Sequence, residues 1–139
     1  VIWVGIDCGV HTGYAVWDSD LRAFVEVRTV AMHTALFAVR ELILHDDVTV
    51  VVEDARQRRW IPDTHDIRRE MGRRQGAGSV KRDAKIWEDF LAEAKVPFQM
   101  VAPAKGATKW TADAFRNLTG WDGSTTEHSR DAAMLVFGR

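Results

Sequence analysis

The sequence predicts an α/β fold in which one five-stranded sheet carries helices on its faces. Three short apolar segments in the first 30 residues are separated by turn residues, which is typical of an antiparallel meander. A dense β-branched segment at residues 48–53 is typical of a strand buried in a sheet. Elsewhere, apolar residues recur at helical spacing. Together these patterns predict three strands, a helix, a strand, a helix, a strand and a helical C-terminal part.

The strands are predicted from apolar or β-branched segments that end at turn residues. Glycines predict a turn over residues 9–13, and acidic and serine residues predict another over residues 18–20. Pro103 follows the last strand. The predicted strands cover residues 2–6, 14–17, 23–30, 48–53 and 98–101.

The helices are predicted from a capping residue followed by apolar residues at helical spacing. Thr34 and Ser79 are expected to begin the first two, and Thr119-Gly120 to end the third. Ser124 and Glu127 fit a capping box at the start of the last helix. The predicted helices cover residues 34–44, 79–95, 108–118 and 124–137.

Composition indicates an ordinary globular domain. The length of 139 residues fits a single domain, with 46% hydrophobic and 28% charged residues. No apolar stretch approaches the roughly 18 residues of a membrane span, and no signal-peptide pattern precedes the first strand. The single cysteine, Cys8, excludes an internal disulfide and fits a reducing compartment. We therefore expect a cytoplasmic protein without a membrane partner.

Positive charge is concentrated in one segment, although the formal net charge of the chain is −1. Residues 56–85 contain ten basic and four acidic residues, a net charge of +6. The rest of the chain contains nine basic and sixteen acidic residues, a net charge of −7. A solvated face normally mixes both signs, so this concentration indicates a surface that binds a polyanion.

Three widely spaced acids lie at the edges of predicted elements. Asp7 follows the first strand, Glu53 ends the β-branched one, and Asp131 lies three residues after His128. A carboxylate at the end of a buried strand is costly to desolvate unless a cation compensates its charge. Carboxylate oxygens suit Mg²⁺, and two such ions can clamp both oxygens of a phosphodiester during an in-line displacement. The acids therefore predict metal-dependent phosphodiester chemistry.

Each of these residues also has a simpler interpretation. Asp7 fits an ordinary turn residue. Glu53 and Asp54 compete for one role, because adjacent strand residues face opposite sides, and a regular strand favours Glu53. His128 and Asp131 share a helix face, which favours a joint role over an ordinary surface histidine. In that role His128 would position or activate water, stabilise a leaving oxygen or bind metal.

The candidate nucleic-acid ligands are mainly the basic side chains of residues 56–85. Arginine and lysine would contact backbone phosphates, although exposed helix charge is the simpler interpretation of each lysine in the 105–109 region. Trp60 would stack on a base or enter a branch point, or else hold its own loop against the domain. The full set is Arg56, Arg58, Arg59, Trp60, Arg68, Arg69, Arg73, Arg74, Lys81, Arg82, Lys85, Lys105 and Lys109.

Four motifs together resemble those of RuvC-type Holliday junction resolvases, which belong to the RNase H-like (retroviral-integrase-like) superfamily. Gly5-Ile6-Asp7-Cys8-Gly9 with Thr12-Gly13-Tyr14-Ala15-Val16 is similar to the first-strand motif, and Val50-Val51-Val52-Glu53 to the second acidic motif. Residues 76–91 resemble the glycine-led helix. His128-Ser129-Arg130-Asp131-Ala132-Ala133 resembles the final motif, in which His or Asp precedes Asp by three residues. The resemblance spans nearly the whole chain.

The resemblance implies an RNase H-like fold with a mixed five-stranded sheet, forming one nuclease domain over residues 1–139. It implies that Asp7, Glu53, His128 and Asp131 are the catalytic and metal-binding residues, with two Mg²⁺ or Mn²⁺ ions per site. It also implies a homodimer that acts on branched DNA, above all a four-way junction. Residues 56–78 are polar, basic and weakly periodic, so they are expected to form a loop without regular structure. They would be a basic DNA-binding insertion, longer than in bacterial members, which favours a bacteriophage protein acting in the host cytoplasm.

Three other functions fit parts of the sequence. The motif at residues 5–9 is also similar to the phosphate-binding opening of actin-like sugar kinases and ATPases. Those proteins need two such domains around a nucleotide, so no nucleotide cofactor is expected here. A non-catalytic module with the same fold would bind a junction or RNA without metal. A related nuclease acting on RNA or RNA–DNA hybrids would share the metal site and differ only in its substrate.

Overall fold

The computed structural model describes residues 1–57, 67–104 and 109–139, with the side chains of all of these except 67–77. Its strands are β1 (Ile2–Asp7), β2 (His11–Asp18), β3 (Ala23–Ala31), β4 (Val48–Glu53) and β5 (Phe98–Val101). They form one five-stranded sheet of order β3-β2-β1-β4-β5. Neighbours among β1, β2 and β3 are antiparallel, while β4 pairs in parallel with β1 and with β5. This is the RNase H-like topology, so the predicted fold class is confirmed.

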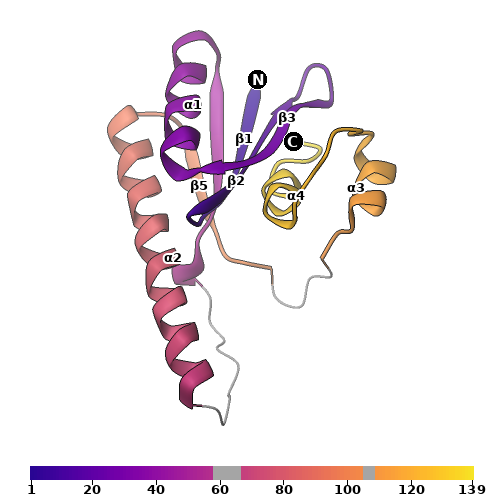
Figure 1. Cartoon of the computed structure of the whole chain (residues 1–139). Helices are drawn as coiled ribbons and strands as arrows, with labels where there is room; N and C mark the ends of the chain where they lie inside the picture. The colour runs from indigo at the N-terminus through magenta and orange to yellow at the C-terminus, as the bar shows by residue number, and fades with distance from the viewer. Residues whose placement is uncertain (58–66, 105–108) are drawn as a thin grey trace.

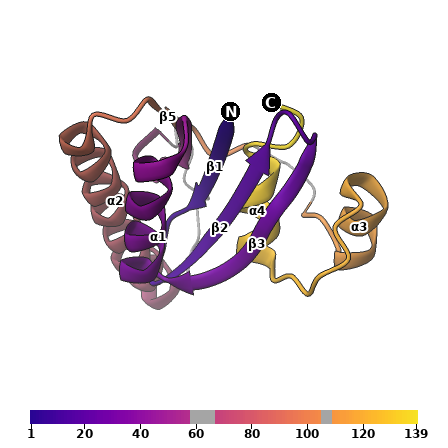
Figure 2. The same cartoon turned by 90° about the horizontal axis from the view of Figure 1, so that it is seen from above.

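Helices cover both faces of this sheet (Figure 1). α1 (Met32–His45) and α2 (Ile67–Ala94) lie on one face, whereas α4 (Glu127–Met134) lies on the other. Figure 2 shows α3 (Ala112–Thr119) on the α4 side, next to β3. A short 3-10 helix, η1 (Ala55–Gln57), follows β4. In the part of the chain that the structure describes, no helix is long and apolar enough to cross a membrane.

Strand alternation divides the buried residues into two cores. Val4 and Ile6 of β1 face α1 and α2, where they join a cluster that includes Trp87. On the opposite face, Val51 of β4 joins Ala132 of α4 in a second cluster. Because β1 alternates, the residues between its apolar ones face α4, and this places the end of the strand beside that helix.

Several predicted boundaries in the first half of the chain are wrong. β2 begins at His11, because residues 11–13 already pair with β3, so the turn does not extend to Gly13. α1 begins at Met32, which puts Thr34 inside the helix. Its N-cap is Ala31, and no side chain caps it. The chain passes directly from β3 into α1, which leaves no connecting loop where Thr34 would act as a cap.

The prediction of an irregular segment up to residue 78 is wrong for residues 67–78, which are helical. α2 begins at Ile67 and has 28 residues, so Ser79 lies within the helix and does not cap it. At 1.5 Å per residue the helix is about 42 Å long. Its first half extends beyond the edge of the sheet at which β1 and β4 end (Figure 1). Weak periodicity and several glycines hid this half in the sequence.

The last two helices begin later than predicted. The predicted start of α3 at residue 108 lies outside the described residues, and the structure begins the helix at Ala112 with Thr111 as its cap. α4 is capped by Thr126 and not by Ser124: Oγ1 of Thr126 accepts from the Ser129 amide, and Oγ of Ser129 accepts from the Thr126 amide. Thr126 also hydrogen-bonds to Thr29 of β3, which ties the start of α4 to the sheet. Glu127 is therefore not part of the capping box.

Candidate active site

Two parallel strands end with an acid at the same edge of the sheet. Asp7 is the last residue of β1 and Glu53 the last of β4, and the strand register makes them direct neighbours. Side chains at paired positions project from the same face, so both lie on the face that α4 covers. Glu53 therefore shares a face with Asp7, whereas Asp54 belongs to the opposite one.

Two glycines allow α4 to lie directly on the sheet. A Cβ atom on Gly13 would be 2.0 Å from the carbonyl oxygen of His128, and one on Gly5 would be 2.0 Å from that of Ala132. Neither position has room for a side chain, so the helix backbone contacts β1 and β2 at these points. This contact brings the first turn of α4 next to Asp7.

The close packing of α4 on the sheet places His128 against Asp7. Nδ1 of His128 lies 3.0 Å from Oδ2 of Asp7, so the Nδ1–H group donates to the carboxylate. Asp7 is only 13% exposed and His128 is 54% exposed. The histidine therefore covers the acid and leaves its other nitrogen, Nε2, for a second partner.

A lysine forms the second contact, on the other predicted acid of α4. Nζ of Lys109 lies 2.5 Å from Oδ2 of Asp131 and 3.6 Å from Oε1 of Glu127. Asp131 is 19% exposed, and Lys109 is 62% exposed. Burial weakens solvent screening, so the Asp131 carboxylate interacts strongly with this ammonium group. The bond to Asp131 is also the main reason why the pKa of Lys109 lies above its usual value.

The positive groups around Asp7 do not fully compensate the burial of its carboxylate. Burial raises the pKa of Asp7 above its ordinary value. The hydrogen bond and charge of His128 act in the opposite direction, the charge of Asp131 raises this pKa further, and the charge of Lys109 lowers it. Because burial outweighs the compensating groups, ionised Asp7 is destabilised, and a bound cation would stabilise it.

Asp54, the weaker candidate in the sequence, has a structural role instead. It is almost fully buried, and Arg56 donates to both of its oxygens, each at 2.9 Å. Arg56 also donates to Glu88 of α2 at 2.6 Å. The bond from Arg56 holds the pKa of Asp54 below its ordinary value. This network joins the end of β4 to α2, and it engages an arginine that the sequence suggested for DNA.

Of the other predicted nucleic-acid ligands, those with described side chains lie mainly on α2. Lys81 and Arg82 are exposed there, while Lys85 pairs with Asp89 at 2.9 Å and Glu88 at 3.5 Å. Arg68, Arg69, Arg73 and Arg74 belong to the first half of the helix, whose side chains are not described. Arg58, Arg59, Trp60 and Lys105 lie outside the described residues.

The carboxylates at this sheet edge match a hard divalent cation in donor type, but two of them are engaged by other side chains and, among the residues that the structure describes, they are not gathered into a metal site. No group of three or more His, Cys, Asp and Glu residues within the described ranges is arranged to hold a metal. Asp7 is bound by His128, and Asp131 by Lys109. Oxygen donors from Asp7, Glu53 and Asp131 are those that Mg²⁺ and Mn²⁺ prefer, and the need of Asp7 for positive charge is what such an ion would meet.

No protein-family model matches this chain, and no curated protein matches it. What the site does is therefore inferred from its own geometry and chemistry. Sequence reasoning did not identify two contacts that shape the site: the bond from Lys109 to Asp131, and the bond from Arg130 to the carbonyl of Trp110 at 2.7 Å. Gly13 was assigned to a turn in the sequence, so the close backbone approach that a strand-interior glycine signals was not predicted there.

Proposed function

We propose that this protein is a divalent-metal-dependent endonuclease that hydrolyses phosphodiester bonds of branched DNA, with the four-way junction as its main substrate. The observation that carries the proposal is the register of β1 and β4, which makes Asp7 and Glu53 neighbours beneath the helix that bears His128 and Asp131. Asp7 and Glu53 come from two separate strands, and His128 bonds to Asp7 from the helix above them. The resemblance of their motifs to junction resolvases supports the same reaction.

In this proposal, Asp7, Glu53 and Asp131 hold two Mg²⁺ or Mn²⁺ ions. Such ions, when bound, supply an activated water and stabilise the departing oxygen. His128 is held by Asp7 through Nδ1–H, so Nε2 is an acceptor that would orient a water and take its proton. The sheet edge and α4 keep these groups in fixed positions and reduce their reorganisation during the reaction.

The substrate class follows from charge. Residues 56–85 carry a net charge of +6, and the helical half of this segment extends past the sheet edge that bears Asp7 and Glu53. A polyanion bound along this helix would reach the acids. Binding through many phosphates makes affinity fall steeply as salt rises. A branched duplex presents phosphates on arms that point in different directions. The two subunits of a homodimer would each contact a different arm.

The test is cleavage of four-way, flap and linear DNAs in Mg²⁺ by the wild type and Glu53→Gln. We expect Glu53→Gln to lower the cleavage rate at least 100-fold while the variant still binds DNA, because the loss removes a ligand and not the basic surface. The matched control is Glu41→Gln, an exposed residue of α1 on the opposite side of the sheet, which should cleave like the wild type. Equal rates for Glu53→Gln and the wild type would disprove the assignment.

A non-catalytic nucleic-acid-binding module is the second candidate. The observation that favours it is the ion pair of Lys109 with Asp131, which occupies a carboxylate that the nuclease needs for metal. This function predicts junction binding that is indifferent to Mg²⁺ and to Asp7→Asn, and no cleavage of any of the three DNAs. An RNA or RNA–DNA hybrid substrate would be recognised by adding those molecules to the same assay.

A further inference from the structure

The ammonium group of Lys109 contacts two acids of α4 beside the proposed metal site. Nζ of Lys109 contacts Asp131 at 2.5 Å and Glu127 at 3.6 Å, and its charge also acts on Asp7. Lys109 is far more exposed than Asp131, so the ammonium approaches the carboxylate from the solvent side. A divalent ion that ligated Asp131 would need to approach the same carboxylate.

The backbone beside this lysine is anchored to α4. Nε of Arg130 donates to the carbonyl oxygen of Trp110 at 2.7 Å, and Nη1 donates to Oγ1 of Thr125 at 2.9 Å. Arg130 directly precedes Asp131, and Trp110 directly follows Lys109. The two neighbours therefore hold the backbone at Lys109 close to that at Asp131, so less backbone entropy is lost when the ion pair forms.

We propose that Lys109 competes with the divalent cation for Asp131: its ammonium neutralises this carboxylate while no metal is bound, and it must leave before Asp131 can ligate a metal. The inference rests on the proposed function, because it takes Asp131 as a metal ligand. Without the ammonium, Asp131 and Asp7 would face each other with less compensation. The metal-free site would then be less stable, and its attraction for a cation would be stronger.

The experiment measures Mn²⁺ binding by isothermal titration calorimetry, without DNA, for the wild type and Lys109→Met. Removal of the competing ammonium should tighten Mn²⁺ binding roughly 1.5- to fivefold, the range expected for one partly exposed ion pair. Lys109→Arg keeps the charge and should bind like the wild type. Lys85→Met is the matched control, because Lys85 also pairs with two acids and is 55% exposed, but lies on α2. Its Mn²⁺ affinity should not change.

Thermal unfolding gives a second readout. In EDTA, Lys109→Met should unfold at a lower temperature than the wild type, and saturating Mn²⁺ should raise its midpoint by more. Mn²⁺ binding by Lys109→Met that equals the wild type, or is weaker, would overturn the inference. If the wild type binds Mn²⁺ and Asp131→Asn weakens that binding, Asp131 is a metal ligand. An unchanged affinity in Lys109→Met then overturns only the inference about the lysine and leaves the proposed function standing. A wild type that neither binds Mn²⁺ nor cleaves DNA would overturn the proposed function as well.

Discussion

At the residue scale, the central feature is Asp7, whose ionised form is destabilised by burial. It is nearly buried at the end of β1, and burial raises its pKa despite the hydrogen bond from His128. In a protein selected for stability alone, an asparagine or an apolar residue would serve better at this position. The presence of a carboxylate at this position supports the metal-binding role proposed above.

The first prediction concerns the stability of Asp7→Asn without metal. In EDTA at pH 7 the variant should be more stable than the wild type by about 1 kcal/mol, because it removes a desolvated charge. A carboxyl whose folded-state pKa is raised destabilises the fold once it ionises. The difference should therefore be absent below the ordinary carboxyl pKa and grow as pH rises through the raised pKa of Asp7.

Denaturant unfolding between pH 3 and 8 measures this difference. Asp47→Asn is the control, since Asp47 is exposed in the turn before β4 and should show no such growth with pH. A variant at Asp7 that is less stable than the wild type across the whole range would show that the carboxylate stabilises the fold, contrary to this account.

At the scale of elements, the position of α4 decides whether the site exists. The strand pattern of β1 and the capping of α4 are local, and both were visible in the sequence, although the cap itself was assigned to the wrong residue. The contact between them is not local, because it joins Gly13 to a helix more than 100 residues later. Strand-interior glycines predict that something approaches closely, and only the fold shows that it is α4.

The second prediction tests this contact with one substitution at two positions. Gly13→Ala places a Cβ against the backbone of His128, so α4 must move, and the protein should lose about 1–3 kcal/mol of stability. Gly78→Ala is the matched control. It lies in α2 with nothing within 4 Å of the added Cβ, so it should be neutral or stabilise by about 0.5–1 kcal/mol.

Urea unfolding measures the stability of the two variants and the wild type. The rate of DNA cleavage reports whether the geometry of the site is preserved. Gly13→Ala should also cleave more slowly, because the movement of α4 separates His128 from Asp7. If both glycine variants are equally stable, the close packing of α4 on β2 is wrong.

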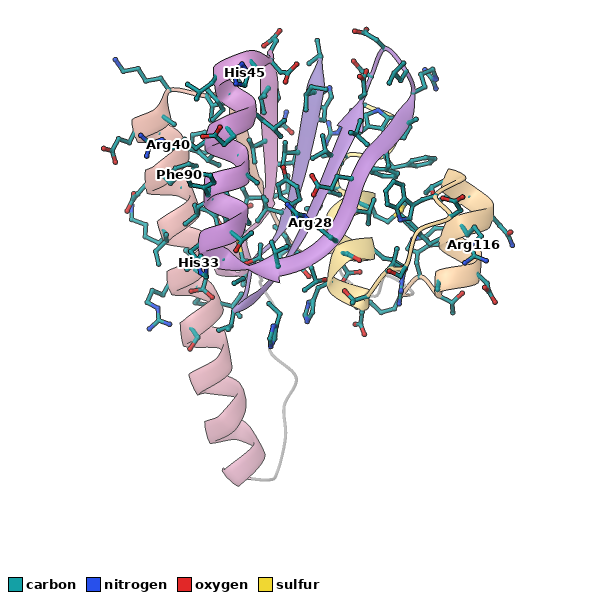
Figure 3. The ribbon with its side chains drawn as sticks, turned by 45° about the horizontal axis from the view of Figure 1, so that its top comes forward. Arg28, His33, Arg40, His45, Phe90 and Arg116 are labelled. Atoms are coloured by element: carbon teal, nitrogen blue, oxygen red, sulfur yellow. The ribbon has the colours of Figure 1, made fainter. Side chains whose placement is uncertain are left out.

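Figure 3 shows Arg40 on α1 and Arg116 on α3, at opposite sides of the molecule, where charge substitutions would serve as further controls.

At the scale of the whole molecule, the sheet was predictable and much of the site's geometry was not. Apolar patterns identified all five strands of the described sheet, because each pattern depends on neighbouring residues. The register of Asp7 with Glu53 joins residues 46 positions apart, and no local pattern contains it. The same holds for the pairing of Lys109 with Asp131 and of Arg56 with Asp54, in which packing selects one partner among many acids.

The net charge of a segment was predictable from the sequence, whereas the arrangement of its charged side chains was not. The excess of basic residues after Glu53 was visible in the sequence, but their arrangement was not. The structure assigns Arg56 to a partly buried ion-pair network and residues 67–78 to a projecting helix, where a loop was predicted. A charge count measures attraction for a polyanion. Which of the side chains are already engaged within the protein depends on the fold.

The central claim is that Asp7, Glu53 and Asp131 hold divalent metal together at one sheet edge. Its most direct test is a crystal of the protein with a four-way DNA junction and Mn²⁺, with anomalous scattering used to locate the ions. The account predicts Mn²⁺ between these three carboxylates, with Nζ of Lys109 no longer in contact with Asp131. Mn²⁺ bound elsewhere, or absent from these carboxylates in a protein that cleaves the junction, would contradict it.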